Sequence, residues 1–338
     1  MRLATALCLA PLMTQAANYT AERDTFNGHP IVRLRDARHQ TEVLISPEKG
    51  NNAFSMKVRG HDVMWTPPEF WTRPTLAGNP LLWPWANRIA GEAYWANGKK
   101  YLLNTGIGNV RKDANQNPIH GLLAFTPTWQ VKSVAGGESS AAVTSRIEYW
   151  RHPDWMAQFP FAHTIEMTYR LQDGVLEVET SIENLSTDFL PLSLGYHPYF
   201  QLTDSPRDAW KVHLAARENV ELSNLLVPTG ATTPNNRPDP YPLQGSQLDN
   251  VFTSLVRDNA GHAVFSVSGQ AQKLEVLFGA KYPVAVVYAP PGREFICFEP
   301  MAGPTNGFNL GHDGKFPLQT IAPGASWRES FWIRPSGF

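Results

Sequence analysis

The chain has 338 residues, of which 42% are hydrophobic and only 17% are charged, so it can bury a large core and is not a disordered protein. The 29 Lys and Arg residues nearly balance the 30 Asp and Glu residues, which leaves no bulk charge to attract nucleic acid or an acidic membrane. We therefore expect a neutral small-molecule partner, no nucleic-acid or membrane partner, and a monomer or weak homodimer.

The N-terminal segment, residues 1–17, has the pattern of a secretory signal. Arg2 precedes an apolar run at 3–13, and residues 14–16 resemble a cleavage site with a small residue at each end. The apolar run is too short to cross a membrane. We expect a secreted or periplasmic protein whose mature chain, residues 18–338, is a single domain. The alternative for this segment is an ordinary disordered start.

From Tyr19 onward, short segments alternate apolar and polar residues and are separated by turns rich in Pro and Gly, while helical periodicity is nearly absent. The clearest pair, 161–171 and 175–183, is joined by Asp173-Gly174 as a hairpin turn. The pattern predicts an all-β sandwich or barrel. Further strands are expected at 31–36, 41–46, 53–59, 62–65, 131–134, 141–150, 210–222, 263–268, 273–278, 284–288, 295–300, 318–321 and 326–332, and loops at 66–100, 227–247 and 303–309.

The most informative stretch is LPLSLGYHPYF, residues 190–200, which begins as a strand with its leucines alternating onto one face. Pro198 prevents the strand from continuing, so we expect His197 at a strand end, beside small residues that leave open volume. A structural, hydrogen-bonded histidine is the alternative reading of this position. His163 lies within the apolar face of the hairpin and is expected to be structural.

Four other polar residues stand at strand ends or in loops, where functional sites are commonly built. Glu299 ends a largely apolar strand and is followed by proline, and a carboxylate there is costly unless it is paired or used. Arg88 offers a rigid fork of donors to hydroxyl or carboxyl oxygens, although a lone loop arginine could equally be a surface charge. His120 lies between a proline bend and a glycine. Asp249 follows a Pro-rich loop and could instead cap a turn.

The segment at 66–100 is long, has no clear period and is rich in Pro, Gly and Trp, which is typical of an ordered functional loop. Its tryptophans could stack on a sugar ring or plug the end of the core, and we expect at least three of the five to do the latter. These five are Trp65, Trp71, Trp83, Trp85 and Trp95.

In this order along the chain, the candidate residues resemble the motifs of the aldose 1-epimerases, the galactose mutarotase family. The motifs are Asn87-Arg88-Ile89, His120-Gly121, Gly195-Tyr196-His197-Pro198-Tyr199-Phe200, Leu248-Asp249 with Phe252, and Phe298-Glu299-Pro300. The resemblance covers residues 25–335 and implies a large antiparallel β-sandwich with a sugar in a groove on one sheet. The run Leu122-Leu123-Ala124-Phe125 departs from the continuation seen in many members, which leaves the substrate preference open.

The resemblance also implies the roles of individual residues. Glu299 matches the catalytic base and His197 the catalytic acid. His120 matches a second active-site histidine, Arg88 and Asp249 match contacts to sugar hydroxyls, and Asn87 completes the substrate-binding set.

The residue types suit this chemistry independently of the resemblance. An aldose ring is a hemiacetal, and opening it removes a proton from the C1 hydroxyl and delivers one to the ring oxygen. One carboxylate and one imidazole, with usual pKa values of about 4.3 and about 6.5, can supply opposite protonation states near neutrality. Rotation about C1–C2 and closure on the other face then give the opposite anomer. No cofactor or metal is expected.

The same residues allow four other readings. A glycosidase could use Asp249 and Glu299 as its two carboxylates, but it would not need the histidines. A non-catalytic sugar-binding module could have lost Glu299 or His197, and both are present. Metal ligands would normally be closely spaced, whereas the nearest candidates here are tens of residues apart. A hexose-6-phosphate 1-epimerase, which a secreted chain would rarely serve, needs a basic cluster, for which the candidates are Arg73, Lys99, Lys100, Arg111 and Lys112.

Overall fold

The computed structural model describes residues 18–338, and most of its regular structure is β-strand. The predicted export signal, residues 1–17, lies outside the described residues and stays a prediction. In the described part of the chain, no helix has the length and apolar character needed to span a membrane.

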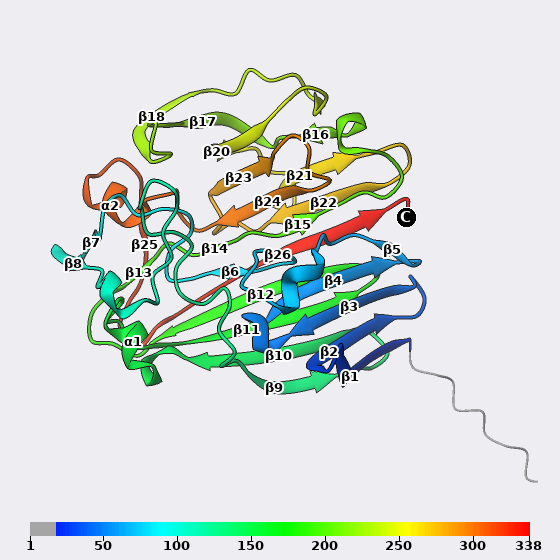
Figure 1. The fold of residues 1–338 in the computed structure, drawn as a ribbon, viewed down its shortest axis with the longest axis horizontal. Coiled ribbons are helices and arrows are strands. Elements are labelled where there is room, and N and C mark those ends of the chain that lie inside the picture. The colour runs from blue at the N-terminus through cyan, green and yellow to red at the C-terminus, as the bar shows by residue number, and fades with distance from the viewer. Residues whose placement is uncertain (1–17) are drawn as a thin grey trace, which may run out of the picture.

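A nine-stranded antiparallel sheet runs through the whole molecule (Figure 1). The last strand of the chain, drawn in red, lies in the middle of this sheet between strands from the second and the last third of the sequence. In spatial order the strands are β19 (Tyr241–Pro242), β16 (Lys211–His213), β21 (Ala263–Ser268), β22 (Lys273–Phe278), β26 (Ser326–Ser336), β12 (Val175–Asn184), β11 (His163–Gln172), β10 (Ala141–Glu148) and β9 (Gln130–Ala135).

An eight-stranded sheet packs against one half of the nine-stranded sheet. The Tyr196 and Phe331 ring centroids lie 4.9 Å apart across this interface, and those of Phe265 and Phe298 lie 6.2 Å apart. Its order is β18 (Pro228–Pro234), β17 (Ala216–Leu222), β20 (Leu248–Leu255), β23 (Val284–Ala289), β24 (Ile296–Met301), β14 (Gly195–Tyr196) and β6 (Leu81–Leu82), with β15 (Tyr199–Phe200) also paired to β24.

A five-stranded sheet covers the other half, where the Tyr169 hydroxyl donates to the Asn51 carbonyl across the interface at 2.8 Å. One continuous buried cluster extends from Tyr19 to Phe338, so the layers share a core and form the predicted antiparallel β-sandwich. The five strands are β1 (Tyr19–Phe26), β2 (His29–Asp36), β3 (Thr41–Ser46), β4 (Asn52–Val58) and β5 (His61–Asp62), in that spatial order.

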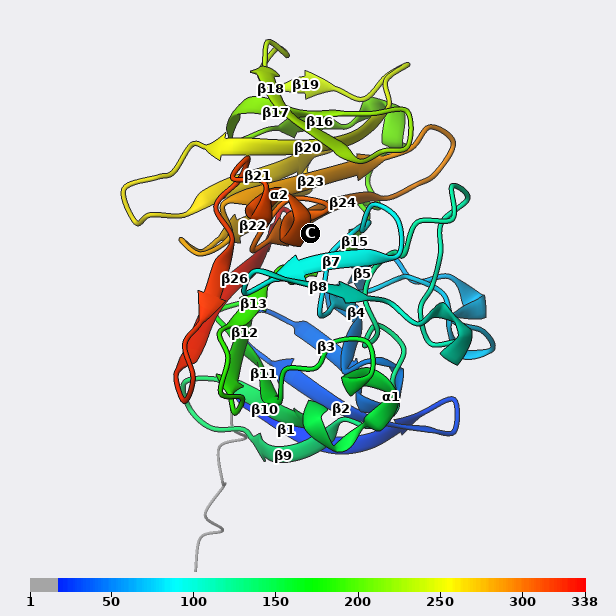
Figure 2. The same cartoon turned by 90° about the vertical axis from the view of Figure 1, so that its left-hand side faces the viewer.

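Small elements close one end of the sandwich, as Figure 2 shows. The hairpin β7 (Ala93–Ala96) and β8 (Lys99–Leu102) lies beside helix α2 (Gly307–His312), and the Trp95 and His312 rings stack with centroids 4.1 Å apart. Strands β13 (Leu190–Leu192) and β25 (Gln319–Ile321) pair nearby, and a short helix, α1 (Pro153–Met156), precedes β11.

The predicted hairpin is confirmed, since β11 and β12 pair in register and both turn residues have left-handed backbone, with φ of 50° at Asp173 and 73° at Gly174. The three loop predictions were wrong in part. Short strands β6 and β7 lie within 66–100 and β8 begins there, β18 and β19 lie within 227–247, and α2 begins within 303–309. A helix of six residues is too short to show a period, and β18 is an edge strand that tolerates its two terminal prolines.

Candidate active site

The six residues predicted for the site line a single cavity of about 240 Å³. They are Asn87, Arg88, His120, His197, Asp249 and Glu299, and the other lining residues are Leu76, Ile119, Tyr199, Val286 and Tyr288. Residues that are far apart in the chain are therefore brought together as the sequence motifs predicted.

The floor of the cavity is the outer face of the eight-stranded sheet. Glu299 of β24 stands opposite Val286 of β23, and Asp249 of β20 stands opposite Tyr288 of β23, so all four side chains share one face. The alternate residues of β24, such as Phe298, point into the main core. Glu299 is therefore the carboxylate of an otherwise apolar strand, as predicted, and its side chain is only 1% exposed.

His197 occupies the bend between β14 and β15, as its preceding strand and following proline predicted. Its backbone N–H donates to the Pro80 carbonyl at 3.1 Å, and the Tyr199 ring stacks on the imidazole at 4.7 Å. Gly195 must be small there, because an added Cβ would lie 2.8 Å from the Ala86 Cβ. In this position the His197 Nε2 lies 3.3 Å from the Glu299 Oε1.

His120 reaches the cavity from a loop with unusual backbone. Its φ is 62°, the following Gly121 has φ of 59°, and its backbone N–H donates to the Asn87 carbonyl at 2.9 Å. The His120 ring is perpendicular to that of His197, with centroids 5.5 Å apart. The proline bend and the glycine seen in the sequence thus indicated a fixed position, although not this conformation.

Arg88 is held at the cavity by a partly buried ion pair. Its Nε donates to the Asp113 Oδ2 at 2.6 Å, and its neighbour Ile89 donates a backbone N–H to the Pro118 carbonyl at 2.9 Å. Because of this ion pair, Arg88 is not a free surface charge. Asp249, the second residue of β20, keeps its solvent exposure where it joins the cavity lining.

Burial dominates the electrostatics of the cavity. Removal from water lowers the pKa of His197 to about 3, with Arg111 adding to the effect. Burial also raises the pKa of Glu299 well above its usual value, reinforced by the nearby Asp249 and opposed by Arg88. Both pKa shifts favour a neutral His197 imidazole beside a protonated Glu299 carboxyl. This neutral pair has the same number of protons as an imidazolium beside a carboxylate.

Several polar atoms at the centre of the cavity have no hydrogen-bond partner among residues 18–338. These atoms are the Glu299 Oε2 and the Nδ1 atoms of His120 and His197. These atoms are therefore available to hydrogen-bond a polar molecule that enters the cavity.

Sequence reasoning missed three residues of this site. Asp113 holds Arg88, while Tyr199 and Tyr288 form part of the walls. The sequence weakly indicated Tyr288, because it is the only residue of the apolar strand β23 with a polar side-chain group. Nothing in the sequence indicated Asp113. Within residues 18–338, no tryptophan lines the cavity that holds Glu299 and His197. Of the five tryptophans considered for stacking, two are buried in the core, Trp83 and Trp85, and three are partly exposed, Trp65, Trp71 and Trp95.

Two of the basic residues named for a phosphate subsite are ion-paired, and a third lies over an aromatic ring. The Arg73 Nη2 pairs with the Glu69 Oε1 at 2.8 Å, the Lys112 Nζ pairs with the Glu92 Oε1 at 2.5 Å, and the Arg111 guanidinium lies over the Phe125 ring at 4.8 Å. Within residues 18–338, no group of three or more His, Cys, Asp or Glu side chains is arranged to hold a metal ion.

A β-sandwich that carries a histidine–glutamate cavity on the outer face of one sheet is an arrangement suited to acid–base chemistry on a small polar molecule. Comparison with known proteins places the chain more closely. The family model described as aldose 1-epimerase matches residues 31–334, so the chain belongs to the aldose 1-epimerase family and is a carbohydrate epimerase by class.

Individual proteins are similar to this chain in sequence or in fold. The chain is 25% identical over 239 residues, 69% of its length and 72% of the relative, to the Escherichia coli K12 protein YihR, which is described as uncharacterized. Its fold is similar to a galactose mutarotase-like protein from Clostridium acetobutylicum, with a TM-score of 0.84, 20% identity, and coverage of 95% of this chain and 99% of that one. It is also similar to galactose 1-epimerase from Lactobacillus acidophilus, with a TM-score of 0.72, 15% identity, and coverage of 96% and 100%.

Proposed function

We propose that the protein interconverts the α and β anomers of free aldohexoses, with Glu299 and His197 as the acid–base pair. The observation that carries the proposal is the 3.3 Å separation of the Glu299 Oε1 and the His197 Nε2 inside a cavity of about 240 Å³. Each of these side chains also has a second polar atom with no partner in the described chain, so both can contact a substrate without breaking another bond.

In the proposed reaction, Glu299 accepts the proton of the C1 hydroxyl while His197 donates a proton to the ring oxygen. The C1–O5 bond breaks, C1 becomes an aldehyde carbon, and the O5 oxygen becomes a hydroxyl. Rotation about C1–C2 presents the other face of the carbonyl, and both proton transfers then run in reverse. No net proton, electron or leaving group is released, so the pair returns to its starting state.

The two protonation states of the pair correspond to the two ends of the ring-opening step. The burial-driven shifts favour the neutral pair in the free enzyme, and this state differs from the ion pair only by a proton moved across one contact. In this proposal, Arg88 and the sugar hydroxyls stabilise the Glu299 carboxylate when the substrate fills the cavity, since Arg88 lowers the pKa of that group. Asn87, His120 and Asp249 orient the remaining hydroxyls.

The test is polarimetry of freshly dissolved α-D-glucose and α-D-galactose. Because a positioned acid or base typically contributes about 10²–10⁴-fold, Glu299→Gln and His197→Asn should each lower the mutarotation rate by that amount. Glu138→Gln and His61→Asn make the same chemical changes at exposed positions and should leave the rate unchanged. Wild-type rates in both site variants would refute the assigned roles.

The same assay separates the other candidate functions. A non-catalytic sugar-binding protein would not accelerate mutarotation above the buffer rate at all. A hexose-6-phosphate 1-epimerase would act on glucose 6-phosphate and not on glucose.

A further inference from the structure

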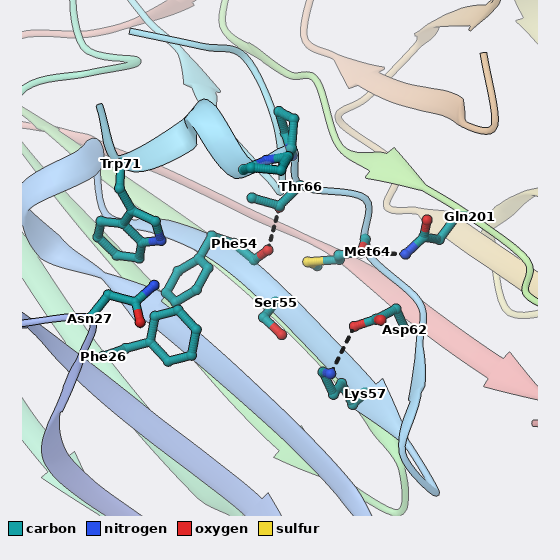
Figure 3. Close-up of a pocket in the computed structure, with 12 residues that line it drawn as sticks. Phe26, Asn27, Phe54, Ser55, Lys57, Asp62, Met64, Thr66, Trp71 and Gln201 are labelled. Carbon is teal, nitrogen blue, oxygen red and sulfur yellow. Dashed lines mark hydrogen bonds and ion pairs between the residues drawn. The ribbon is translucent and has the colours of Figure 1, made fainter. Parts of the chain in front are cut away.

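A second cavity, of about 390 Å³, lies on the outer face of the five-stranded sheet (Figure 3). Its walls come from the β1–β2 turn, strands β4 and β5, the segment at 64–71, and Gln201 just after β15. It shares no lining residue with the cavity that holds Glu299 and His197.

A β-bulge in β4 gives this cavity both an aromatic ring and a hydroxyl. Ala53 pairs with Ile45 and Ser55 pairs with Leu44, which leaves Phe54 as an extra residue without a cross-strand partner. Ala53 is therefore buried in the main core, while Phe54 and Ser55 both line the outer cavity. Bulges commonly re-aim side chains next to functional sites.

One wall of the cavity is aromatic. The Phe54 ring centroid lies 5.6 Å from that of Phe26 and 5.0 Å from that of Trp71, and the Phe54 and Trp71 rings are nearly perpendicular, at 81°. Figure 3 shows these three rings together on one side of the cavity. Phe26 and Trp71 keep part of their surface exposed, so the wall offers apolar ring surface to a ligand.

The rest of the lining offers hydrogen-bonding groups without net charge. Lys57 and Asp62 neutralise each other at 3.3 Å, and the Gln201 side-chain amide donates to the Met64 carbonyl at 3.3 Å. The side chains of Ser55 and Asn27 make no hydrogen bond within residues 18–338. In Figure 3, Lys57, Asp62 and Gln201 lie on the side away from the rings, whereas Asn27 lies beside them, so donors and acceptors flank the aromatic wall.

We propose that this cavity is a binding site for a neutral carbohydrate, separate from the catalytic cavity. A sugar presents C–H faces, which suit aromatic rings, and hydroxyl edges, which suit uncharged donors and acceptors. The volume falls within the range typical of small-molecule sites. The lining contains no counterpart of the histidine–glutamate pair of the catalytic cavity, and we assign it a binding role.

Titration calorimetry with maltose, cellobiose and lactose tests this site on the Glu299→Gln protein, in which turnover is expected to be about 10²–10⁴-fold slower. We expect saturable binding of at least one disaccharide that becomes about tenfold weaker in Trp71→Ala, which removes a ring contact. Ser55→Leu should weaken it to the same extent by filling the cavity without deleting a packed side chain. Trp95→Ala, a change in a tryptophan that stacks on His312 elsewhere, should leave it unchanged.

Two outcomes would overturn the proposal. One is the absence of saturable binding for all three disaccharides; the other is binding that Ser55→Leu leaves unchanged but Arg88→Ala abolishes, which would place the sugar in the catalytic cavity. The Ser55→Leu change in the otherwise wild-type protein should keep the wild-type mutarotation rate, which shows that the fold is intact. The test therefore fails or succeeds separately from the proposed epimerase activity.

Discussion

A carboxylate that sequence reasoning did not identify controls how Arg88 meets its ligand. The Asp113 Oδ2 accepts a hydrogen bond from the Arg88 Nε at 2.6 Å. Its Oδ1 accepts from the backbone N–H groups of Asn115 and Asn117, both at 2.9 Å. Its pKa lies below the usual value, with the Arg88 bond the largest of the effects that outweigh burial. Asp113 is thus a positioning residue that fixes both a loop and an arginine.

We predict that Asp113→Asn raises the KM for the aldose about tenfold with a much smaller change in kcat. The amide keeps the Oδ1 contacts of the loop but loses the charge that orients Arg88, and a charge-assisted bond is worth roughly 1.5–3 kcal/mol. Asp258→Asn is the matched control, because Asp258 accepts from Ala260 and His262 in the same spacing, and Arg88 is not its partner. A fall in kcat at constant KM would contradict a positioning role.

The central pair could be located from the sequence because local rules were broken there. Glu299 is an acid in an apolar strand, and His197 precedes a proline that ends a strand. Asp113 breaks no local rule, since an aspartate in a polar loop is ordinary. Its role depends on the contact with Arg88, 25 residues away in the chain, which only the folded structure reveals.

At the scale of elements, the loop carrying His120 depends on glycine. At Gly121 the φ is 59°, and a Cβ there would lie 2.1 Å from the Trp83 carbonyl oxygen. The two segments run side by side, since Leu122 donates its backbone N–H to the same oxygen at 2.6 Å. The glycine thus allows the loop to lie against the segment after β6.

Gly121→Ala should therefore destabilise the protein by more than about 2 kcal/mol, because the left-handed backbone alone costs roughly 1–2 kcal/mol and the clash with Trp83 adds to it. Gly98→Ala measures the cost of the left-handed backbone alone, since Gly98 has φ of 71° and an added Cβ would have nothing within 4 Å. Urea denaturation of both variants gives the comparison. Equal losses would show that the close approach to Trp83 is not a constraint.

Elements with strong alternation were predictable, and those defined by their neighbours were not. The β11–β12 hairpin carries its own pattern and turn, so its pairing follows from local sequence. Strands β6 and β14 have two residues each. They are strands only because β14 pairs with β24 and with β6, and no local sequence pattern predicts these pairings. The stretch at 190–200 is also buried on both faces, so its alternation did not distinguish an inner from an outer side.

At the scale of the whole molecule, buried histidines tie stability to pH. His163 is fully buried, accepts from the Trp83 Nε1–H at 2.9 Å and donates from its Nδ1 to the Phe161 carbonyl at 2.6 Å, so it is structural, as predicted. A proton on its Nε2 would face the indole N–H. Burial accordingly lowers its pKa from the usual 6.5 to about 3.

Because the folded-state pKa of His163 is depressed, its contribution to stability is present above pH 6.5 and is lost as the pH falls toward about 3. Between pH 7 and pH 5 we expect the wild type to lose about 2 kcal/mol more unfolding free energy than His163→Gln, whose amide can replace both hydrogen bonds. His120, His197 and Glu299 also titrate anomalously, but they are common to both proteins. Urea denaturation at the two pH values measures the difference, and parallel pH profiles would contradict the assignment.

The position of β26 at the centre of the nine-stranded sheet has a consequence for synthesis. Until Ser326–Ser336 leaves the ribosome, β22 and β12 have no strand between them, and the sheet exists only as two halves. A nascent chain can form the hairpins of either half, but it cannot join them. Completion of the sheet therefore requires β26, and a premature stop before β26 would leave two exposed strand edges that could pair with other chains.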